Sequence, residues 1–215
     1  MASGARIQIV DYRLGNLFSI QQACERVGLD AFVSANPDAL ASVDGIILPG
    51  VGAFGDAMNN LKELRLLDPL CKAAGNGKPL LGICLGMQLL FKKSEEFGDH
   101  EGLGLLSGYV EKIPEQTAGD RKLRVPNVGW NRIRFANRSD VAAVLDGVED
   151  GAWMYFVHSY CARPGNLGDQ LTLTDYGTIR YCSGVLRGSI LGVQFHPEKS
   201  GRIGLRMYEN WARGL

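Results

Sequence analysis

Residues 82–86, which read Gly-Ile-Cys-Leu-Gly, constrain the fold of this 215-residue chain more than any other segment. They join an apolar run at 80–83 to an apolar pattern with helical spacing that we expect to extend over 85–93. The flanking glycines let the backbone turn sharply without Cβ clashes, which pushes the side chain of Cys84 out of the turn. A strand, this turn and a helix form the pattern of a nucleophile elbow, here with sulfur in place of a serine oxygen. The alternative is a tight turn around an inert cysteine. A base placed close to Cys84 is needed to favour the nucleophile over this alternative.

Residues 189–198 supply such a base, because an apolar run ends there in His-Pro-Glu. Pro197 cannot donate to a sheet ladder and marks the end of regular pairing. In extended backbone, residues two apart project to the same side, so the Glu198 carboxylate can reach the His196 imidazole. That contact fixes the tautomer and leaves the other ring nitrogen to exchange a proton with sulfur. Of the three histidines only His196 has this setting, and we predict a Cys84–His196–Glu198 triad.

A further glycine-rich turn, Pro-Gly-Val-Gly at 49–52, follows the apolar run 45–48. Acyl transfer from a sulfur puts negative charge on the former carbonyl oxygen, and preorganised backbone N–H groups stabilise that charge. Gly50 and Gly52 let a strand end bring its amides close to a substrate, so the amides of Val51 and Leu85 are the candidate oxyanion donors. Taken alone, an ordinary loop between a strand and a helix explains this turn at least as well.

The composition, with 46% hydrophobic and 21% charged residues, is that of an ordinary globular domain. Basic and acidic residues number 23 each, so no charge imbalance favours a nucleic acid or an anionic membrane as a partner. No apolar stretch is long enough to span a bilayer, and we expect no leader before the first strand. Five cysteines without Cys-x-x-Cys spacing disfavour a disulfide framework and favour a cytoplasmic location. We expect neither a metal nor a cofactor.

Strand and helix patterns alternate in the first half of the chain. We expect strands at 6–10, 31–34, 45–48 and 80–83, and helices at 17–27, 53–61, 66–74 and 85–93. Strands that are apolar on both faces, in this order, predict an α/β fold with a mainly parallel central sheet and helices on both faces. Active residues belong at the carboxyl ends of such strands, where Gly50, Cys84 and His196 all fall.

Short β-type segments replace this alternation after residue 104. They lie at 108–113, 131–135, 154–157, 171–174, 181–186 and 190–195, and we expect them to form an antiparallel β extension of the sheet or to pack beside it. An amphipathic helix over about 203–213 closes the chain, whereas the polar stretch 114–124 gives no clear prediction. Because no repeat or linker interrupts the chain, we predict a single domain over residues 1–215.

These motifs together resemble those of the triad (class I) glutamine amidotransferases, in matching order and spacing over essentially the whole chain. More narrowly, Gly-Ile-Cys-Leu-Gly-Met-Gln-Leu-Leu-Phe at 82–91 and three further segments look like the glutaminase subunits of imidazole glycerol phosphate synthases, which serve histidine biosynthesis. The three further segments are Pro-Asn-Val-Gly-Trp-Asn at 126–131, Tyr-Phe-Val-His-Ser-Tyr at 155–160 and His-Pro-Glu-Lys-Ser at 196–200.

The resemblance implies hydrolysis of L-glutamine to glutamate and ammonia. Cys84 would attack the side-chain amide, His196 would move the proton, and Glu198 would orient the histidine. The implied substrate contacts are Gln88, Glu96, Ser159 and Tyr160. For Gln88 the alternative is a satisfied polar group on a helix, and for Glu96 it is membership of a solvated acidic cluster.

The implied partner is a separate (β/α)8 cyclase subunit that forms a heterodimer with this chain and receives the ammonia through its interior. We expect the triad fold to take up the whole chain and to leave no second domain that could use the ammonia, which would otherwise escape as ammonium. Candidates for the docking face are Trp130, Asn131, Tyr155 and Lys199. A core position for Trp130 is the alternative.

Other classes stay open at this point. A glutaminase of another ammonia-channelling synthase, such as anthranilate synthase, would keep the first half-reaction, although the Gly-Trp-Asn segment counts against it. A triad cysteine peptidase or hydrolase would cleave peptides rather than free glutamine, and a non-catalytic binding protein would normally have lost a triad residue. We also expect the loop at Gly50 and Gly52 to rest with its amide turned away until partner and acceptor bind.

Overall fold

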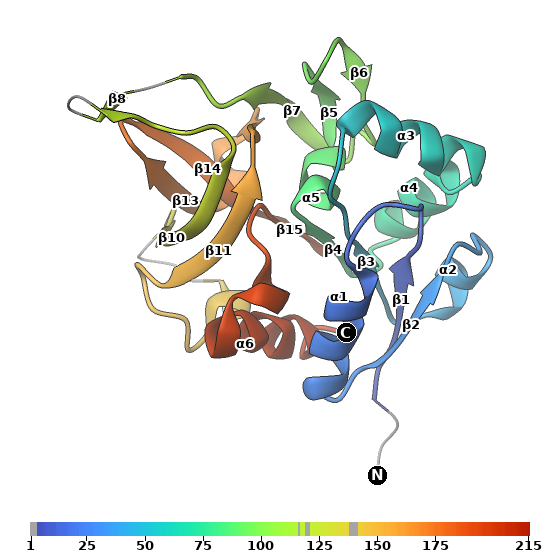
Figure 1. The fold of residues 1–215 in the computed structure, drawn as a ribbon. Coiled ribbons are helices and arrows are strands. Elements are labelled where there is room, and N and C mark those ends of the chain that lie inside the picture. Colours follow the sequence, from blue (N-terminus) through green and yellow to red (C-terminus); the bar gives the residue numbers. More distant parts are fainter. Residues whose placement is uncertain (1–3, 116, 119–120, 138–141) are drawn as a thin grey trace.

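The structure, a computed structural model, describes residues 4–115, 117–118, 121–137 and 142–215 (Figure 1). Within these residues, thirteen strands form one mixed sheet. Five strands in the order β2-β1-β3-β4-β15 form its parallel part. Their bounds are Arg6–Val10 (β1), Asp30–Ser34 (β2), Gly45–Leu48 (β3), Leu80–Ile83 (β4) and Ile190–Val193 (β15).

Helices cover both faces of the parallel part, as the sequence predicts. One face carries α1 (Leu17–Arg26) and α6 (Gly201–Ala212). The other carries α2 (Ala39–Ser42), α3 (Phe54–Glu63), α4 (Leu67–Gly75) and α5 (Leu85–Leu89). Every residue of β3, β4 and β15 is buried, because side chains from both sides of these strands enter a core.

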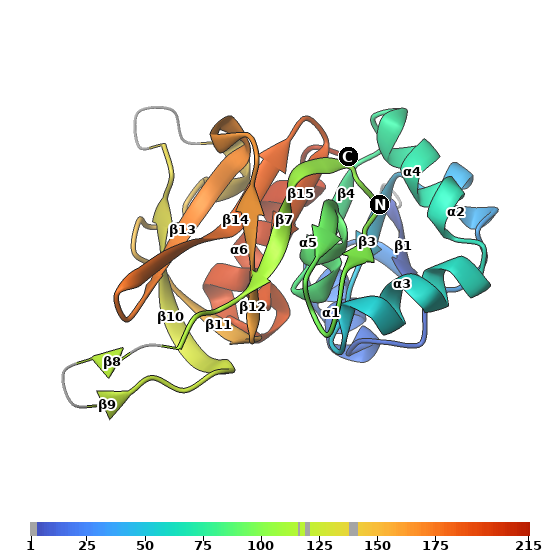
Figure 2. The ribbon, with the colours of Figure 1, turned by 90° about the horizontal axis from the view of Figure 1, so that it is seen from above.

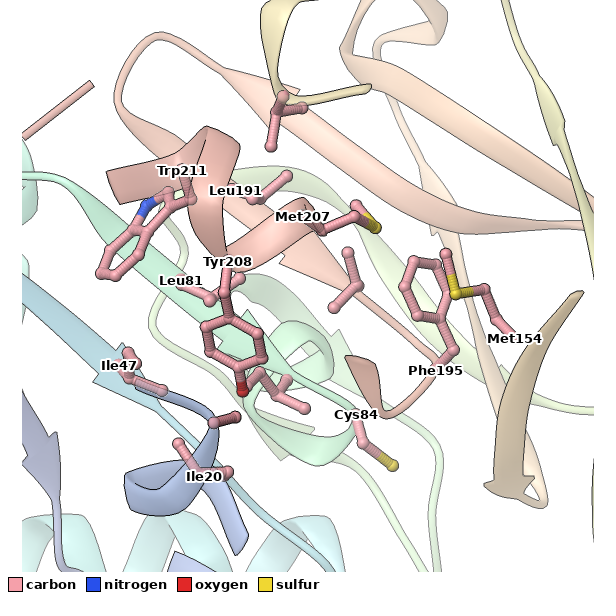
Figure 3. Close-up of a cluster of buried hydrophobic side chains, with 14 of the residues drawn as sticks. Ile20, Ile47, Leu81, Cys84, Met154, Leu191, Phe195, Met207, Tyr208 and Trp211 are labelled. Atoms are coloured by element: carbon pink, nitrogen blue, oxygen red, sulfur yellow. The ribbon is translucent and has the colours of Figure 1, made fainter. Parts of the chain in front are cut away.

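The core beneath α1 and α6 reaches the end of β4. Figure 3 shows Met207, Tyr208 and Trp211 of α6 turned toward the sheet, with Cys84 at the border of the same cluster. Burial of each large apolar side chain of this kind stabilises the fold by roughly 1.5–3 kcal/mol. The position of Cys84 is therefore fixed by a well-packed layer.

The extension begins at β15, whose other neighbour is β14, and it is antiparallel except for the parallel pair of β5 and β7. Figure 2 shows this part of the sheet beside the parallel strands and their helices. The remaining strands are β5 (Phe91–Ser94), β6 (His100–Glu101), β7 (Leu106–Lys112), β10 (Asn127–Phe135), β11 (Trp153–His158), β12 (Tyr160–Pro164), β13 (Gln170–Tyr176) and β14 (Ile179–Arg187). Short 3-10 turns are η1 (Ala143–Leu145), η2 (Leu167–Asp169) and η3 (Pro197–Lys199).

Several sequence predictions fail in their extent. The strand expected over 131–135 begins at Asn127 and forms the nine-residue β10. The helix expected over 85–93 ends at Leu89, and residues 91–94 form β5, which pairs with β7. Leu89, Leu90 and Phe91 are all buried, although the first lies in α5 and the last in β5. The apolar pattern therefore does not show where the helix ends and the strand begins. The strand expected over 190–195 stops at Val193, and Gln194 turns its amide side chain toward Cys84. The strand β12 is absent from the prediction because Arg163 and Pro164 interrupt its apolar pattern.

The polar stretch 114–124 lies partly outside the described residues. Within it, Thr117–Ala118 (β8) and Arg121–Lys122 (β9) pair as a separate two-stranded sheet. Among the described residues, no helix is both long and apolar enough to cross a membrane. The cytoplasmic location stays a prediction.

Candidate functional site

Cys84 occupies the sharp turn between β4 and α5. Its backbone is left-handed, with φ 56° and ψ −108°, and its amide donates to the carbonyl of Val193 at 2.7 Å. The glycines on either side serve close packing: a Cβ at Gly82 would lie 2.9 Å from the backbone of Gly86, and a Cβ at Gly86 only 1.8 Å from Leu48 O. The expected elbow is present, and the strained residue is the cysteine itself.

His196 and Glu198 lie at the carboxyl end of β15, as the sequence predicts. The His196 Nδ1 is 2.8 Å from Glu198 Oε1, and because a carboxylate only accepts, Nδ1 carries the hydrogen. Both side chains are at least 96% buried. The His196 amide donates to Tyr155 O at 2.9 Å, and Ser200 Oγ donates to His196 O at 2.7 Å, so the backbone of the histidine is held from two sides.

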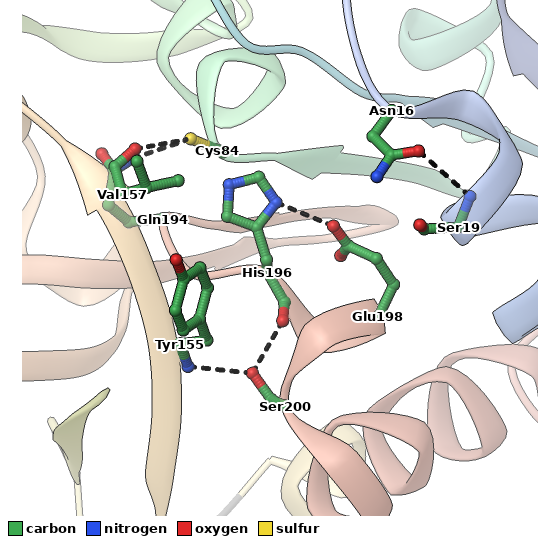
Figure 4. A network of polar contacts seen from close by, with 9 residues as sticks. All are labelled: Asn16, Ser19, Cys84, Tyr155, Val157, Gln194, His196, Glu198 and Ser200. Carbon is green, nitrogen blue, oxygen red and sulfur yellow. Dashed lines mark hydrogen bonds and ion pairs between the residues drawn. The ribbon is translucent and has the colours of Figure 1, made fainter. Parts of the chain in front are cut away.

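The imidazole stands between the Cys84 sulfur and the Glu198 carboxylate, with Nε2 on the side of the sulfur (Figure 4). Burial lowers the pKa of His196, but the interactions with Cys84 and Glu198 outweigh it and raise the pKa above the usual range. Nε2 makes no hydrogen bond of normal geometry to the part of the chain that the structure describes. The cysteine thiol instead donates to Val157 O at 3.7 Å. The three triad residues are thus brought together, with Nε2 left for a proton transfer.

The loop Pro49–Ala53 packs against this turn. The amide of Leu85, one of the two candidate oxyanion donors, donates to Gly50 O at 3.3 Å. Tyr12 Oη donates to Pro49 O at 2.5 Å, and an added Cβ at Gly50 would lie 2.1 Å from that same Oη. Gly52 has φ +125°, a conformation that favours glycine. Of the two candidate donors, Leu85 is therefore bound within the protein in this geometry.

A cavity of about 250 Å³ opens beside the sulfur. Its walls include Cys84, the candidate oxyanion residues apart from Gly50 and all four expected substrate contacts, but not His196 or Glu198. The lining residues are Val51, Gly52, Cys84, Leu85, Gln88, Glu96, Pro126, Val157, His158, Ser159 and Tyr160. Among the described residues, no cluster of three or more His, Cys, Asp or Glu could hold a metal ion.

The two side chains expected to contact substrate are already engaged in part. Gln88 donates through Nε2 to Tyr160 O at 3.0 Å and to Gln194 Oε1 at 2.9 Å. Its NH2 group is therefore satisfied within the protein, as in the alternative interpretation, and its Oε1 remains available to a ligand. Glu96 accepts from the amide of Phe54 at 2.7 Å, at the start of α3. Burial raises the pKa of Glu96. Glu96 is therefore part of the pocket wall rather than of a solvated cluster.

Sequence reasoning missed Gln194, a fully buried side chain that donates to the Cys84 sulfur at 3.7 Å. It also missed a role for His158, which lines the cavity and is 6% exposed. The signal was available for Gln194, because a polar residue inside an apolar run two places before the triad histidine needs a hydrogen-bonding partner. No such signal marks His158, whose partners come from other strands.

The candidate docking residues separate into two groups. Trp130 and Tyr155 face each other across β10 and β11, with ring centroids 6.0 Å apart, and Lys199 Nζ lies 5.8 Å from the Tyr155 ring. Trp130 is 51% exposed, so it is not a core residue. Asn131 follows Trp130 in the strand and therefore projects to the opposite side, where its Nδ2 donates to Asn127 Oδ1. Its side chain does not join the aromatic group.

A family model for "Glutamine amidotransferase class-I" matches residues 8–213 of the chain. The chain belongs to this family of class-I glutamine amidotransferases. The fold agrees: a structure described as "Crystal structure of glutamine amidotransferase" aligns over 97% of this chain and 99% of its own, with a TM-score of 0.72 at 19% identity. PurLQS from Thermotoga maritima aligns over 98% and 99%, with a TM-score of 0.74 at 20% identity.

Curated relatives carry a narrower name. A protein of Geobacillus thermodenitrificans (strain NG80-2) is 47% identical over 95% of this chain and 94% of its own length, and one of Aquifex aeolicus (strain VF5) is 44% identical over 97% and 96%. Each is named "Imidazole glycerol phosphate synthase subunit HisH". The chain thus resembles these subunits over nearly their whole length, as the motifs at 126–131 and 155–160 indicate.

Proposed function

We propose that this chain is the glutaminase subunit of an imidazole glycerol phosphate synthase, which hydrolyses L-glutamine and passes ammonia to a separate cyclase subunit. The observation that carries the proposal is the line of sulfur, imidazole and carboxylate at the carboxyl ends of β4 and β15, beside a cavity (Figure 4). The full-length similarity to relatives named as HisH subunits supports this assignment over an anthranilate-synthase glutaminase or a peptidase.

The reaction follows from the positions of the three side chains. His196 Nε2 takes the thiol proton of Cys84, and the sulfur attacks the side-chain amide carbon of glutamine. Glu198 stabilises the imidazolium through Nδ1–H, which agrees with the raised pKa of His196. The imidazolium then protonates the departing nitrogen, and ammonia leaves a glutamyl thioester on the sulfur. Water, activated by the same imidazole, releases glutamate and restores the thiol.

Negative charge on the tetrahedral intermediate requires backbone donors near the Cys84 sulfur. The Gly50 carbonyl, which accepts from Leu85, belongs to the same peptide unit as the Val51 amide, and these two groups point in opposite directions. A half-turn of this one peptide would free the Leu85 amide and direct the Val51 amide toward the site. This geometry supports a resting loop that becomes productive when partner and acceptor bind.

The aromatic group around Trp130 supports a docking role. Tyr155 is next to the catalytic machinery, since its carbonyl accepts from the His196 amide and its own amide donates to Ser200 Oγ at 3.0 Å. An exposed tryptophan packed against a tyrosine beside the triad offers the residue types that anchor protein interfaces. We infer that the cyclase, a (β/α)8 barrel in the proposal, covers this surface and forms a heterodimer with the chain.

Co-purification with the candidate cyclase, followed by assays with two nitrogen sources, tests the proposed function. Cys84→Ala should abolish glutamine-dependent synthesis of imidazole glycerol phosphate and leave synthesis with ammonium salts intact. Cys71→Ala is the matched control, because this half-buried cysteine lies in α4 and bonds only weakly, at 3.7 Å, to Leu103 O. Activity of Cys84→Ala with glutamine would contradict the proposed nucleophile, and cleavage of peptides by the wild type would favour a peptidase.

A further inference from the structure

A chain of buried hydrogen bonds lies behind the proposed glutamine pocket and takes no part in the reaction described above. It is formed by Asn127 of β10, His158 of β11 and Tyr181 of β14, which are 1%, 6% and 1% exposed. Asn127 and His158 stand directly opposite each other in the β10–β11 pair. Two of these residues belong to the segments 126–131 and 155–160, which set this chain apart within its family.

With a neutral imidazole, the bonds have one direction along this chain. Nδ1 of His158 is 2.8 Å from Tyr160 O, which can only accept, so Nδ1 carries the hydrogen. Nε2 must then accept, and Tyr181 Oη donates to it at 3.0 Å. The lone pairs of that hydroxyl accept from Asn127 Nδ2 at 3.1 Å, and Asn127 Oδ1 accepts from Asn131 Nδ2 at 3.0 Å.

The charge states agree with this arrangement. Burial lowers the pKa of His158 to about 4, although its bond to the Tyr160 carbonyl opposes the shift. Burial likewise raises the pKa of Tyr181 far above its usual range. At neutral pH the imidazole is therefore uncharged and can accept, and the phenol keeps the hydrogen that it donates.

The bonds end at the wall of the pocket. Tyr160 O, which His158 holds, is the same oxygen that accepts from Gln88 Nε2 at 3.0 Å. Gln88 donates in turn to Gln194, whose amide donates to the Cys84 sulfur (Figure 4). A single carbonyl thus joins the buried chain to the residues around the nucleophile.

We propose that Asn127, Tyr181 and His158 are positioning residues that fix the peptide wall at Ser159 and Tyr160, and through it the affinity of the pocket for glutamine. This inference rests on the proposed function. A carbonyl held by two donors cannot rotate, so the pocket is preorganised, and loss of one donor would let the wall move. Because the wall contacts the substrate before and during the reaction, the effect should fall on KM rather than on kcat.

Tyr181→Phe in the assembled enzyme tests the inference. The substitution removes the hydroxyl and keeps the ring, whose edge-on contact with Phe156 at 6.4 Å preserves the packing. His158 Nε2 then keeps only the longer contact to Asn127 Nδ2, at 3.5 Å, and a buried acceptor that loses its better donor is costly. We expect KM for glutamine to rise about tenfold, kcat to change less than about threefold, and ammonium-dependent synthesis to stay unchanged.

Tyr176→Phe is the matched control, because its hydroxyl donates to Arg124 O at 2.6 Å at the surface of the β13–β14 hairpin. It should leave KM unchanged. Asn127→Asp provides a second variant of almost equal volume, which can no longer donate to Tyr181 and should raise KM similarly. An unchanged KM in both Tyr181→Phe and Asn127→Asp, or a loss confined to kcat, would overturn the inference.

A separate measurement on the free chain distinguishes this inference from the proposed function. Nitrogen-15 NMR of the histidine rings should show His158 neutral, with the hydrogen on Nδ1, at pH 6, and its Nε2 resonance should move in Tyr181→Phe. A charged ring, or a hydrogen on Nε2, would overturn the inference whatever the enzyme does. If the spectrum is as expected but the wild-type complex does not hydrolyse glutamine, the proposed function is wrong. The inference about glutamine affinity is then wrong as well.

Discussion

Cys84 is held in a backbone conformation that an isolated cysteine avoids. A non-glycine residue with positive φ costs on the order of 1–3 kcal/mol, and it persists only where the surroundings over-determine it. Here β4 leads into the turn, the amide bonds to Val193, and Gly82 and Gly86 allow backbones to approach too closely for any side chain. These surroundings hold the sulfur in the wall of the cavity, where a substrate carbon can reach it.

Gly50→Ala should disable glutamine hydrolysis without unfolding the protein. The new Cβ would meet Tyr12 Oη at 2.1 Å and Leu85 Cβ at 3.0 Å, so the loop that carries the Val51 amide must shift. We expect kcat/KM for glutamine to fall about 100-fold, the usual effect of losing one oxyanion donor. Ammonium-dependent synthesis should persist in the complex. Gly75→Ala, where a Cβ meets open space at the end of α4, should show wild-type kinetics, and equal kinetics in Gly50→Ala would contradict the role of this loop.

His158 should make the stability of the free chain depend on pH between about 4 and 6.5. Its folded pKa is lowered to about 4, so below pH 6.5 the unfolded chain binds a proton that the folded chain does not. Stability is therefore fully present above pH 6.5 and is lost as the pH falls. This group alone should cost about 2 kcal/mol of unfolding free energy at pH 5. Urea unfolding at pH 7 and pH 5 should show that loss in the wild type and a smaller one in His158→Gln, and identical losses would contradict the buried neutral ring.

The triad could be named from the sequence because each member ends a recognisable local pattern. Cys84 stands in a turn flanked by glycines, and His196 and Glu198 share one side of an extended segment. The pairing of Asn127 with Tyr181 could not be named, because it depends on the register of β10, β11 and β14, which no local pattern contains. Likewise, the sequence offers the Leu85 amide as a donor but gives no hint that the Gly50 carbonyl accepts from it.

At the scale of elements, β10 and β11 form a ribbon with two different faces. The inner face carries Asn127 and His158, and the outer face carries three directly opposed pairs. These are Val128 with Val157, Trp130 with Tyr155, and Arg132 with Trp153. Arg132 also lies over the Trp153 ring, 4.9 Å from its centroid. One ribbon therefore carries the proposed docking residues on one side and the proposed positioning residues on the other.

Trp130→Ala should weaken binding of the cyclase and leave the fold intact. The side chain is half exposed on the outer face and packs against Tyr155, so truncation removes an aromatic anchor without opening the core. We expect the dissociation constant to rise at least about tenfold, as is usual for an interface tryptophan. Leu167→Ala removes an exposed apolar side chain from η2, outside this ribbon, and should not change the affinity. Equal affinities for all three proteins in a titration would exclude this docking surface.

The boundaries of an element could be predicted where its apolar run ends with the element. The prediction failed where the apolar run continues past the end of the element. β1, β3 and β4 have the predicted bounds, because turn or polar residues flank each short apolar run. The change from α5 to β5 occurs inside an unbroken apolar run, and pairing of β5 with β7 decides it. Periodicity cannot anticipate a partner strand that comes later in the chain.

At the scale of the whole molecule, the site lies where the parallel and antiparallel parts of the sheet meet. β15 pairs with β4 on its parallel side and with β14 on its antiparallel side. Just beyond β15, the His196 amide donates to Tyr155 O of β11, which ties the triad to the ribbon that we propose as the docking surface. This arrangement is consistent with one domain over residues 1–215, which stays a prediction. A partner bound at the ribbon would also lie close to the catalytic residues and could affect their geometry.

Glutamine hydrolysis should therefore be slow in the isolated chain and fast in the complex with cyclase and an acceptor analogue. In the isolated chain the Leu85 amide is bound to Gly50 O, and the oxyanion has to be stabilised without it. If docking turns the Gly50–Val51 peptide, the gain should approach the 10²–10³-fold that one donor supplies, and it should appear in kcat because the oxyanion forms only during the reaction. Gly50→Ala in the complex should lose most of this activation, whereas Gly75→Ala should keep it. Equal turnover by the isolated chain and the complex would show that the loop is not a switch.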